Sequence, residues 1–196
     1  MKNIIDQIKK YKDIVESKTF KKGETIFYEN ETCTKIGIID SGEISIKSYF
    51  SNGKEVVYNN LQKGQMFGNN LIFSSNPQYR GDVIAEHDTE VFFINKESLI
   101  YILQNDVDFL NTYLTEQSDF GKTLNLKIKL LTITSASDRL IYFLTVNKNK
   151  IQYKTVTKLA NELYLTRESL SRTLKKLKEN KIIMIGKKTI TLMVDE

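Results

Sequence analysis

The sequence is poor in the residues that most metal and redox sites need. Its 196 residues include one cysteine, Cys33, and one histidine, His87. One cysteine allows no internal disulfide, no iron–sulfur cluster and no Cys-rich zinc site within one chain. We expect Cys33 to be a small buried hydrophobe more than a redox sensor, and His87 an ordinary turn imidazole more than a haem or metal ligand, with no metal site; a sensing role of either residue is left open. The cytoplasm is the compartment consistent with this cysteine usage.

Long apolar runs and familiar catalytic motifs are missing as well. No apolar stretch approaches the ~20 residues needed to span a bilayer, and residues 1–10 mix charges with isoleucines. We therefore expect neither membrane insertion nor export. The sequence shows no phosphate-binding loop and no paired-carboxylate pattern, so we expect no enzyme.

Positive charge is concentrated in the last third of the chain. Residues 135–196 hold 13 Lys and Arg against 6 Asp and Glu, a net +7, whereas residues 1–134 hold 16 against 18, a net −2. A basic segment joined to a near-neutral one is typical of a module that binds a polyanion, although a lysine-rich solvated surface would give the same count.

The first half of the chain has the pattern of a small β-rich domain after one helix. Isoleucines at helical spacing predict an amphipathic helix over residues 3–16,. Short β-rich runs follow at residues 25–28, 36–39, 43–47, 55–58 and 91–94. Turn signals separate them at 22–23, 41–42, 52–53, 63–64 and 76–77, and the Asn-Gly pair at 52–53 is a strong hairpin signal,. Many short strands at this spacing predict a barrel or roll.

The segment 106–133 is predicted to form one long helix with two apolar stripes. Its first stripe has coiled-coil spacing and predicts a seam between two copies of the chain; it comprises Leu110, Tyr113, Gln117, Phe120, Leu124, Lys127 and Leu131. The second stripe would cover the β-rich domain and comprises Leu114, Leu126, Ile128, Leu130 and Ile133. A helix that packs only on its own domain is the alternative.

The last 62 residues are predicted to hold three helices and a two-stranded wing. Ser137-Asp138, Thr155 and Thr166 are the expected caps of helices that end near Val146, Leu163 and Asn180, and the wing spans residues 182–194,. Two short helices joined by the tight turn at 164–166 must cross steeply, which is helix-turn-helix geometry.

The third of these helices offers polar groups suited to double-stranded DNA. Arg167, Glu168, Ser171 and Arg172 lie near its amino end and away from its apolar face, where recognition helices contact base edges. We expect contacts to phosphate from Lys175, Lys176 and Lys178 and from the polar residues at the helix starts, Thr155, Thr166 and Ser169,.

Several segments together resemble the cyclic-AMP receptor protein/FNR family of bacterial transcription regulators, over nearly the whole chain. They are residues 22–26, 38–44, 63–68, 138–140 and, most specifically, 166–172. The resemblance implies an α+β chain with an N-terminal β-roll (a cyclic-nucleotide-binding-like jelly roll), a long dimerisation helix and a C-terminal winged helix-turn-helix. The corresponding domains are 1–105, 106–134 and 135–196. It further implies a homodimer that recognises a palindromic site with a TGA core and acts with RNA polymerase.

The effector pocket implied by the resemblance departs from the family pattern. It would comprise Gly68, Asn69, Asn70, Arg80, Gly81 and Asn125. In members that bind cyclic AMP, a Glu contacts the ribose and an Arg-Ser pair binds the cyclic phosphate; here Asn69 and Gly81 replace the Glu and the Ser. A cyclic nucleotide is therefore disfavoured, the effector is unknown, and Arg80 could equally be a solvated loop residue.

Two further features set expectations for the structure. Tyr164 stands where the family usually has Gly in the helix-turn-helix turn, so a positive φ there would cost ~1–2 kcal/mol. Residues 135–137 are expected to be a hinge through which an effector in the roll shifts the recognition helices. The competing hypothesis is a ligand-binding signalling module whose helical tail contacts protein instead of DNA, which a flat response of affinity to salt would favour.

Overall fold

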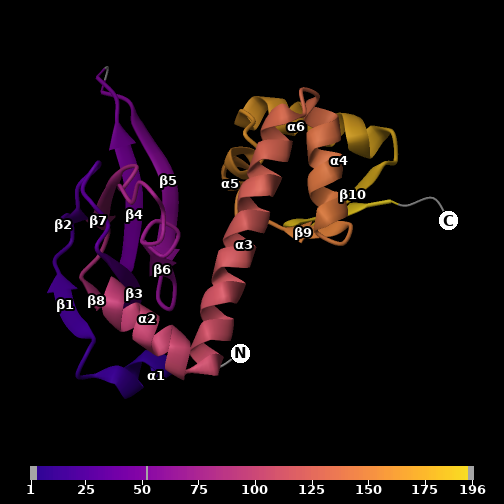
Figure 1. The fold of residues 1–196 in the computed structure, drawn as a ribbon. Helices are drawn as coiled ribbons and strands as arrows, with labels where there is room; N and C mark the ends of the chain where they lie inside the picture. Colours follow the sequence, from indigo (N-terminus) through magenta and orange to yellow (C-terminus); the bar gives the residue numbers. More distant parts are fainter. Residues whose placement is uncertain (1–3, 52, 194–196) are drawn as a thin grey trace. The chain divides into compact units, whose positions relative to one another are not determined.

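The computed structural model describes residues 4–51 and 53–193, which form two compact units, Met1–Asp119 and Phe120–Glu196. The first unit is a β-roll built from two four-stranded antiparallel sheets, and the second is a winged helix-turn-helix preceded by half of a long helix (Figure 1). The predicted α+β fold class, with its roll, long helix and winged helix-turn-helix, is confirmed. None of the helices in the described ranges combines the length and apolar character that crossing a bilayer requires.

Each of the two sheets of the roll combines strands that are far apart in the sequence. One sheet has the order β1-β8-β3-β6, formed by Glu16–Phe20, Thr89–Asn95, Lys35–Ser41 and Met66–Phe67. The other has the order β2-β7-β4-β5, formed by Thr25–Phe27, Asp82–Ala85, Glu43–Tyr49 and Glu55–Gln62. Strand β3 is buried over most of its length because it lies between two neighbours, whereas the edge strand β5 is mostly exposed.

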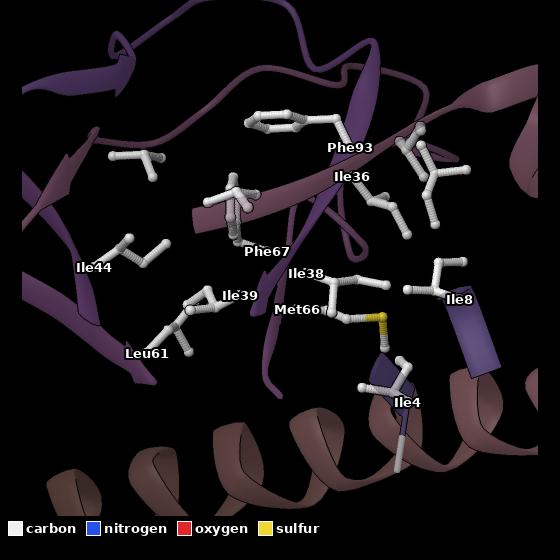
Figure 2. Close-up of a cluster of buried hydrophobic side chains, with 14 of the residues drawn as sticks. Ile4, Ile8, Ile36, Ile38, Ile39, Ile44, Leu61, Met66, Phe67 and Phe93 are labelled. Atoms are coloured by element: carbon white, nitrogen blue, oxygen red, sulfur yellow. The ribbon is translucent and has the colours of Figure 1, made fainter. Parts of the chain in front are cut away.

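The roll encloses a core of isoleucine and aromatic side chains. Figure 2 shows Ile36, Ile38, Phe67 and Phe93 gathered with side chains from facing strands. The Phe27 ring stacks on the buried Tyr79 ring at 4.7 Å between centroids, and meets the rings of Phe67 and Phe93 edge-on. Offset-stacked and edge-to-face pairs are the favoured aromatic geometries, so these side chains fill the roll with apolar volume.

Several predictions of local structure in the first unit are wrong in detail. The N-terminal helix is α1, Ile4–Ile8, followed by a 3₁₀ turn at Lys9–Tyr11, and the predicted start at Asn3 lies outside the described residues. The chain is already a strand at Glu16. Strands β1, β6 and β7 and helix α2, Lys96–Asn105, were not predicted; α2 is capped by Asn95, whose side chain accepts a hydrogen bond from the Ser98 N–H.

The predicted hairpin between the fourth and fifth strands is present with a longer connection. The last pair of residues in register is Tyr49 and Glu55, so residues 50–54 join the strands instead of a two-residue turn. Asn52 of the predicted Asn-Gly turn lies outside the described residues, and Gly53 has the positive φ expected of it.

The long helix is confirmed as α3, Val107–Thr132, and the structure assigns its apolar residues differently from the sequence pattern. Tyr113, expected in the seam, is buried in the core of its own unit. Leu126 and Leu130, expected to cover the roll, pack instead into the apolar cluster of the C-terminal unit. Ile128, assigned to the same stripe, is exposed. Helical spacing alone did not show which neighbour each stripe meets.

The C-terminal unit contains the three predicted helices and one unexpected strand. Helices α4, α5 and α6 span Ala136–Val146, Val156–Glu162 and Arg167–Glu179. The wing strands β10, Ile183–Gly186, and β11, Thr189–Leu192, pair antiparallel, and β9, Lys150–Gln152, adds a third strand on the far side of β11. The predicted end of the wing at Val194 lies outside the described residues.

Candidate nucleic-acid interface

The recognition helix α6 starts at a well-formed cap. The Thr166 hydroxyl accepts a hydrogen bond from the Ser169 N–H at 3.1 Å, and on α5 the Thr155 hydroxyl accepts one from the Lys158 N–H at the same distance. Both caps were predicted. On α4 the cap is Ser135 instead of the predicted Ser137, and its hydroxyl accepts from the Asp138 N–H at 3.3 Å.

Helix α6 separates an apolar face from a polar one. Leu170, Leu174 and Leu177 are buried in the cluster that also holds Leu159, Ala160 and Leu163 of the preceding helix and turn. The four predicted base-contacting residues, Arg167, Glu168, Ser171 and Arg172, are all exposed. Glu168, Ser171 and Arg172 recur three or four residues apart and so share one face, and Arg167 is exposed beside them in the first turn,. The fold thus leaves two guanidinium groups, a carboxylate and a hydroxyl free of its core at the amino end of one helix.

The remaining predicted contact residues are also at the surface. Lys175, Lys176 and Lys178 are exposed in the second half of α6, and Thr155 and Thr166 are exposed at the helix starts. Ser169 is half-buried, and its backbone N–H is already bonded to the Thr166 hydroxyl. Among the lysines, Lys175 lies 3.9 Å from the Glu179 carboxylate, a distance that leaves it able to exchange this partner for a phosphate,.

The sequence interpretation overlooked cations outside α6. Lys187 and Lys188 form the exposed turn between β10 and β11, and Lys188 has φ +58°. Lys154 and Lys158 are exposed beside the start of α5. The charge count of residues 135–196 included all four, and the predicted wing already placed the first two at a hairpin tip. They extend the basic surface of this unit beyond the recognition helix.

The turn between α5 and α6 has the left-handed residue that a glycine usually supplies in the family, so of the two possibilities, a different turn or a tolerated strain, the structure has the second. Tyr164 adopts φ +54° and its side chain is 41% exposed. Its carbonyl oxygen and that of Leu163 accept hydrogen bonds from the Arg139 guanidinium at 2.9 and 3.1 Å. The departure from glycine is therefore tolerated, with a buried arginine bonded to the turn.

The second candidate site is the predicted effector pocket at the turn after β6, where a backbone carbonyl is bonded to α3 of the same unit. The Asn69 carbonyl oxygen accepts hydrogen bonds from the Tyr113 hydroxyl at 2.9 Å and from the Gln117 side-chain amide at 2.6 Å. Burial raises the pKa of the Tyr113 hydroxyl, so this donor stays protonated at neutral pH. The first part of α3 is thereby fastened to the turn at Gly68–Asn69.

Two glycines in this region leave little room for a side chain. A Cβ at Gly68 would lie 3.0 Å from the Cys33 sulfur and 3.1 Å from the Tyr79 hydroxyl. A Cβ at Gly81 would lie 2.5 Å from the Lys47 carbonyl oxygen, so a serine there would require the strand to shift. Arg80, next to Gly81, is exposed, as is Asn70, while Asn125 is exposed in the other unit.

Cys33 is placed as the sequence predicted. It is 3% exposed, and its thiol donates weakly to the carbonyl oxygens of Lys35 and Gly68 at 3.5 and 3.6 Å. Burial raises the pKa of this thiol, which disfavours the reactive thiolate,. The geometry is that of a packing residue.

Family models match both ends of the chain. The model described as the cyclic nucleotide-binding domain matches residues 17–106, and the model of bacterial regulatory proteins of the crp family matches residues 158–183. Together they cover more than half of the chain. No curated protein sequence is significantly similar to it.

Solved structures share the fold of this chain or of a large part of it. A transcriptional regulator from Thermotoga maritima is 24% identical over 64% of this chain and 97% of its own, with a TM-score of 0.60. The catabolite activator protein of Thermus thermophilus is 20% identical over 98% of this chain and 91% of its own, with a TM-score of 0.56. A CooA variant from Carboxydothermus hydrogenoformans is 17% identical over 97% and 91%, with a TM-score of 0.66.

At these sequence identities the solved structures show the fold of the chain, and the family models show the family to which it belongs. A roll of the cyclic nucleotide-binding type, a long helix and a DNA-binding helix-turn-helix of the crp type follow one another in this order. The chain belongs to the cyclic-AMP receptor protein/FNR family of bacterial transcription regulators.

Proposed function

We propose that this protein is a homodimeric, sequence-specific regulator of transcription that binds a palindromic DNA site in the cytoplasm and acts with RNA polymerase. The observation that carries the proposal is the polar face of α6, where Arg167, Glu168, Ser171 and Arg172 are all exposed above a leucine face that is buried. Arg is suited to the two acceptors of guanine and Glu to the cytosine amino group, and each good pair discriminates by ~1–3 kcal/mol.

Affinity independent of sequence would come from cations that contact phosphate. The proposed set is Lys175, Lys176 and Lys178, with Thr155, Thr166 and Ser169 at the helix starts and Lys187 and Lys188 on the wing. Each phosphate contact displaces condensed counterions, so binding should weaken steeply with salt.

The dimer is proposed to form along exposed apolar residues of α3. Phe120, Leu124, Ile128 and Leu131 are between 43% and 57% exposed. They recur three or four residues apart, which places them on one face of the helix. Leu110, half-buried, is proposed to extend this seam, whereas Tyr113 is left out because its side chain lies in its own core.

The control of the protein is proposed to differ from that of the cyclic-AMP receptor. A carboxylate for the ribose and a hydroxyl for the cyclic phosphate are replaced by Asn69 and Gly81. The Asn69 carbonyl is bonded to α3, and Gly81 has no space for a serine side chain. We therefore propose that a small effector of this roll, with Arg80 as its candidate anchor, is not a cyclic nucleotide.

Selection of binding sites from random duplexes tests the DNA proposal. We expect an inverted repeat with a TGA-type core, and a slope of log affinity against log salt of about −4 or steeper, as several phosphate contacts require. Recovery of no inverted repeat, or a flat salt response, would contradict the proposal and favour a tail that contacts protein. For the roll, calorimetry with cyclic AMP and cyclic GMP should show no binding at ligand concentrations of about 1 mM, well above usual effector affinities.

A further inference from the structure

Arg139, in the first turn of α4, is a buried arginine that binds three backbone carbonyls from two separate segments. Its side chain is 9% exposed. The Nε and Nη2 atoms both donate to the Ile133 carbonyl oxygen, with Nε at 3.0 Å. The Nη1 atom donates to the carbonyl oxygens of Leu163 at 3.1 Å and Tyr164 at 2.9 Å. One guanidinium therefore joins residue 133 to residues 163–164.

Both segments are the carboxyl ends of helices. Helix α3 ends at Thr132, and the Ile133 N–H still bonds to the Lys129 carbonyl. Helix α5 ends at Glu162, with Leu163 as its cap. The last carbonyls of a helix lack partners within it and lie at the negative end of its dipole. A cation buried against two such ends is compensated without a carboxylate, and the planar fork of Arg matches the carbonyls where the flexible ammonium of Lys does not.

The carbonyl of Tyr164 links Arg139 to the start of the recognition helix. Tyr164 holds a left-handed backbone conformation that is unfavourable for a side chain of its size,. Two residues later, Thr166 caps α6, and Arg167 is its first residue. The position of residue 164 therefore sets where the recognition helix begins.

We propose that Arg139 is a positioning residue that fixes the direction of the dimer seam relative to the recognition helix. The exposed seam at Phe120, Leu124 and Leu131, the arginine, and helix α6 all belong to one compact unit, Phe120–Glu196. Residues 133–135 between α3 and α4 are not helical, so the packing of Leu126 and Leu130 holds the end of α3 to its unit and the arginine adds the hydrogen bonds that fix the angle of this short joint. Ala136 and Ser137, expected in a hinge, are part of α4.

The inference rests on the proposed function, because two copies joined at the seam present two recognition helices. Arg139 would then set the separation and relative rotation of these helices. Lengthening the spacer of a palindromic site by one base pair moves the half-sites apart by about 3.4 Å and rotates them by about 35°. A dimer with a rigid joint cannot follow this change, whereas a dimer with a loosened joint can.

The test measures the affinity of the full-length protein for its selected site and for versions with the spacer one base pair longer or shorter. We expect the wild type to bind the altered spacers about 100-fold more weakly, since contacts in one half-site are lost. Arg139→Lys keeps the charge and loses the fork, and should reduce this discrimination to about fivefold or less. The penalty for a single mismatch inside a half-site should stay unchanged, because the recognition residues are intact. General destabilisation would weaken all sites alike.

A matched control separates the arginine from the flexibility of the joint itself. Thr134 is exposed in the same joint, and Thr134→Gly makes the backbone more flexible without touching the guanidinium,. Spacer discrimination should survive in Thr134→Gly and be lost in Arg139→Lys. Discrimination that survives in folded Arg139→Lys, or that Thr134→Gly abolishes as fully, would overturn the proposal.

A stabilised parent protein, Tyr164→Gly, allows the test to be made even if Arg139→Lys alone does not fold. Tyr164→Gly should raise the melting temperature by removing the left-handed strain, and should keep the spacer discrimination because the carbonyl remains bonded to Arg139. If Arg139→Lys alone does not fold, the same comparison is made between Tyr164→Gly and Tyr164→Gly/Arg139→Lys. A wild type that binds no inverted repeat would instead refute the proposed function, so the two failures are distinct.

Discussion

The two units of this chain differ in whether the polar groups of their candidate sites are bonded within the fold. In the C-terminal unit, the charged side chains at the start of α6 are exposed, and the core below them is made of leucines. In the roll, the backbone carbonyl of Asn69 at the candidate pocket is bonded to Tyr113 and Gln117 of the same unit, while the candidate anchor Arg80 is exposed. One unit thus presents a group of exposed charged side chains on one helix, whereas in the other a backbone carbonyl at the candidate pocket is already bonded within the fold.

This difference concerns which unit retains the functional groups that its family uses to bind DNA or a ligand. A surface that contacts DNA needs exposed donors, and folding leaves them exposed when the opposite helix face is apolar. A pocket needs buried groups held open for a ligand, which is costly unless the ligand is bound. Replacement of the acidic residue by Asn69 and of the hydroxyl by Gly81 is consistent with a roll that serves mainly as a scaffold for α3.

The largest effect on the C-terminal unit is expected from a substitution in the proposed dimer seam of α3. Leu124→Asp places two charges against each other in that seam and should give a monomer. Affinity for the palindromic site should fall by about two orders of magnitude or more, because the second half-site no longer binds intramolecularly. Sedimentation and DNA binding measure the two effects. Ile100→Asp, at an isoleucine of α2 that is 39% exposed, should remain dimeric; a dimeric Leu124→Asp would refute the seam.

A smaller change tests whether the exposed face of α6 confers specificity and the roll does not. Arg172→Ala should reduce affinity for the selected site about 10- to 100-fold and remove the preference at one base pair of each half-site. Competition binding against single-base variants measures it, with sedimentation as the check on the dimer. Arg80→Ala, at an arginine of the roll that is also exposed, is the control and should change neither affinity nor preference when the purified protein is assayed without an effector. An unaltered preference in Arg172→Ala would show that this residue does not contact a base.

Within the roll, Tyr113→Phe removes one of the two donors to the Asn69 carbonyl while the ring continues to fill the core. The opening free energy of the segment around residues 66–72 should fall by about 1 kcal/mol, the usual net value of such a bond. Hydrogen exchange followed by mass spectrometry resolves this local effect. Tyr101→Phe, at a tyrosine that is 56% exposed, should leave exchange unchanged. Equal exchange in Tyr113→Phe and the wild type would show that the bond does not hold the turn.

The smallest effect expected is a pH dependence of the roll. The hydrogen bond from Lys47, at 2.6 Å, and that from Ser45 lower the pKa of the Glu86 carboxyl. Because the folded pKa is depressed, the stabilisation is complete above the ordinary pKa of a glutamate and is lost as the pH falls through the lowered value. For a pair this exposed the loss should not exceed about 1 kcal/mol. Acid unfolding of the roll should depend less on pH in Glu86→Gln, and an identical profile would show that the pair contributes nothing.

The elements that the sequence predicted well are those with strong local signals. Thr155 and Thr166 cap helices because their hydroxyls reach N–H groups three residues on, which depends on nothing distant,. The positive φ of Tyr164 was considered only because the family usually has Gly at this position, and the structure shows that the tyrosine adopts it. By contrast, the short strands β1 and β7 were missed, since their pairing with distant strands stabilises them more than their own residues do,.

The sequence by itself determined the order of the elements, the basic charge of the last third and the polar side of the recognition helix, because periodicity and charge are properties of neighbouring residues. Only the tertiary structure decided that Tyr113 belongs to the core of the roll and that Leu130 packs into the core of the winged helix-turn-helix. It also decided that Arg139 joins the end of α3, six residues before it, to the end of α5, 24 and 25 residues after it. These contacts link segments far apart along the chain, and a helical pattern records which face is apolar but not which neighbour that face meets.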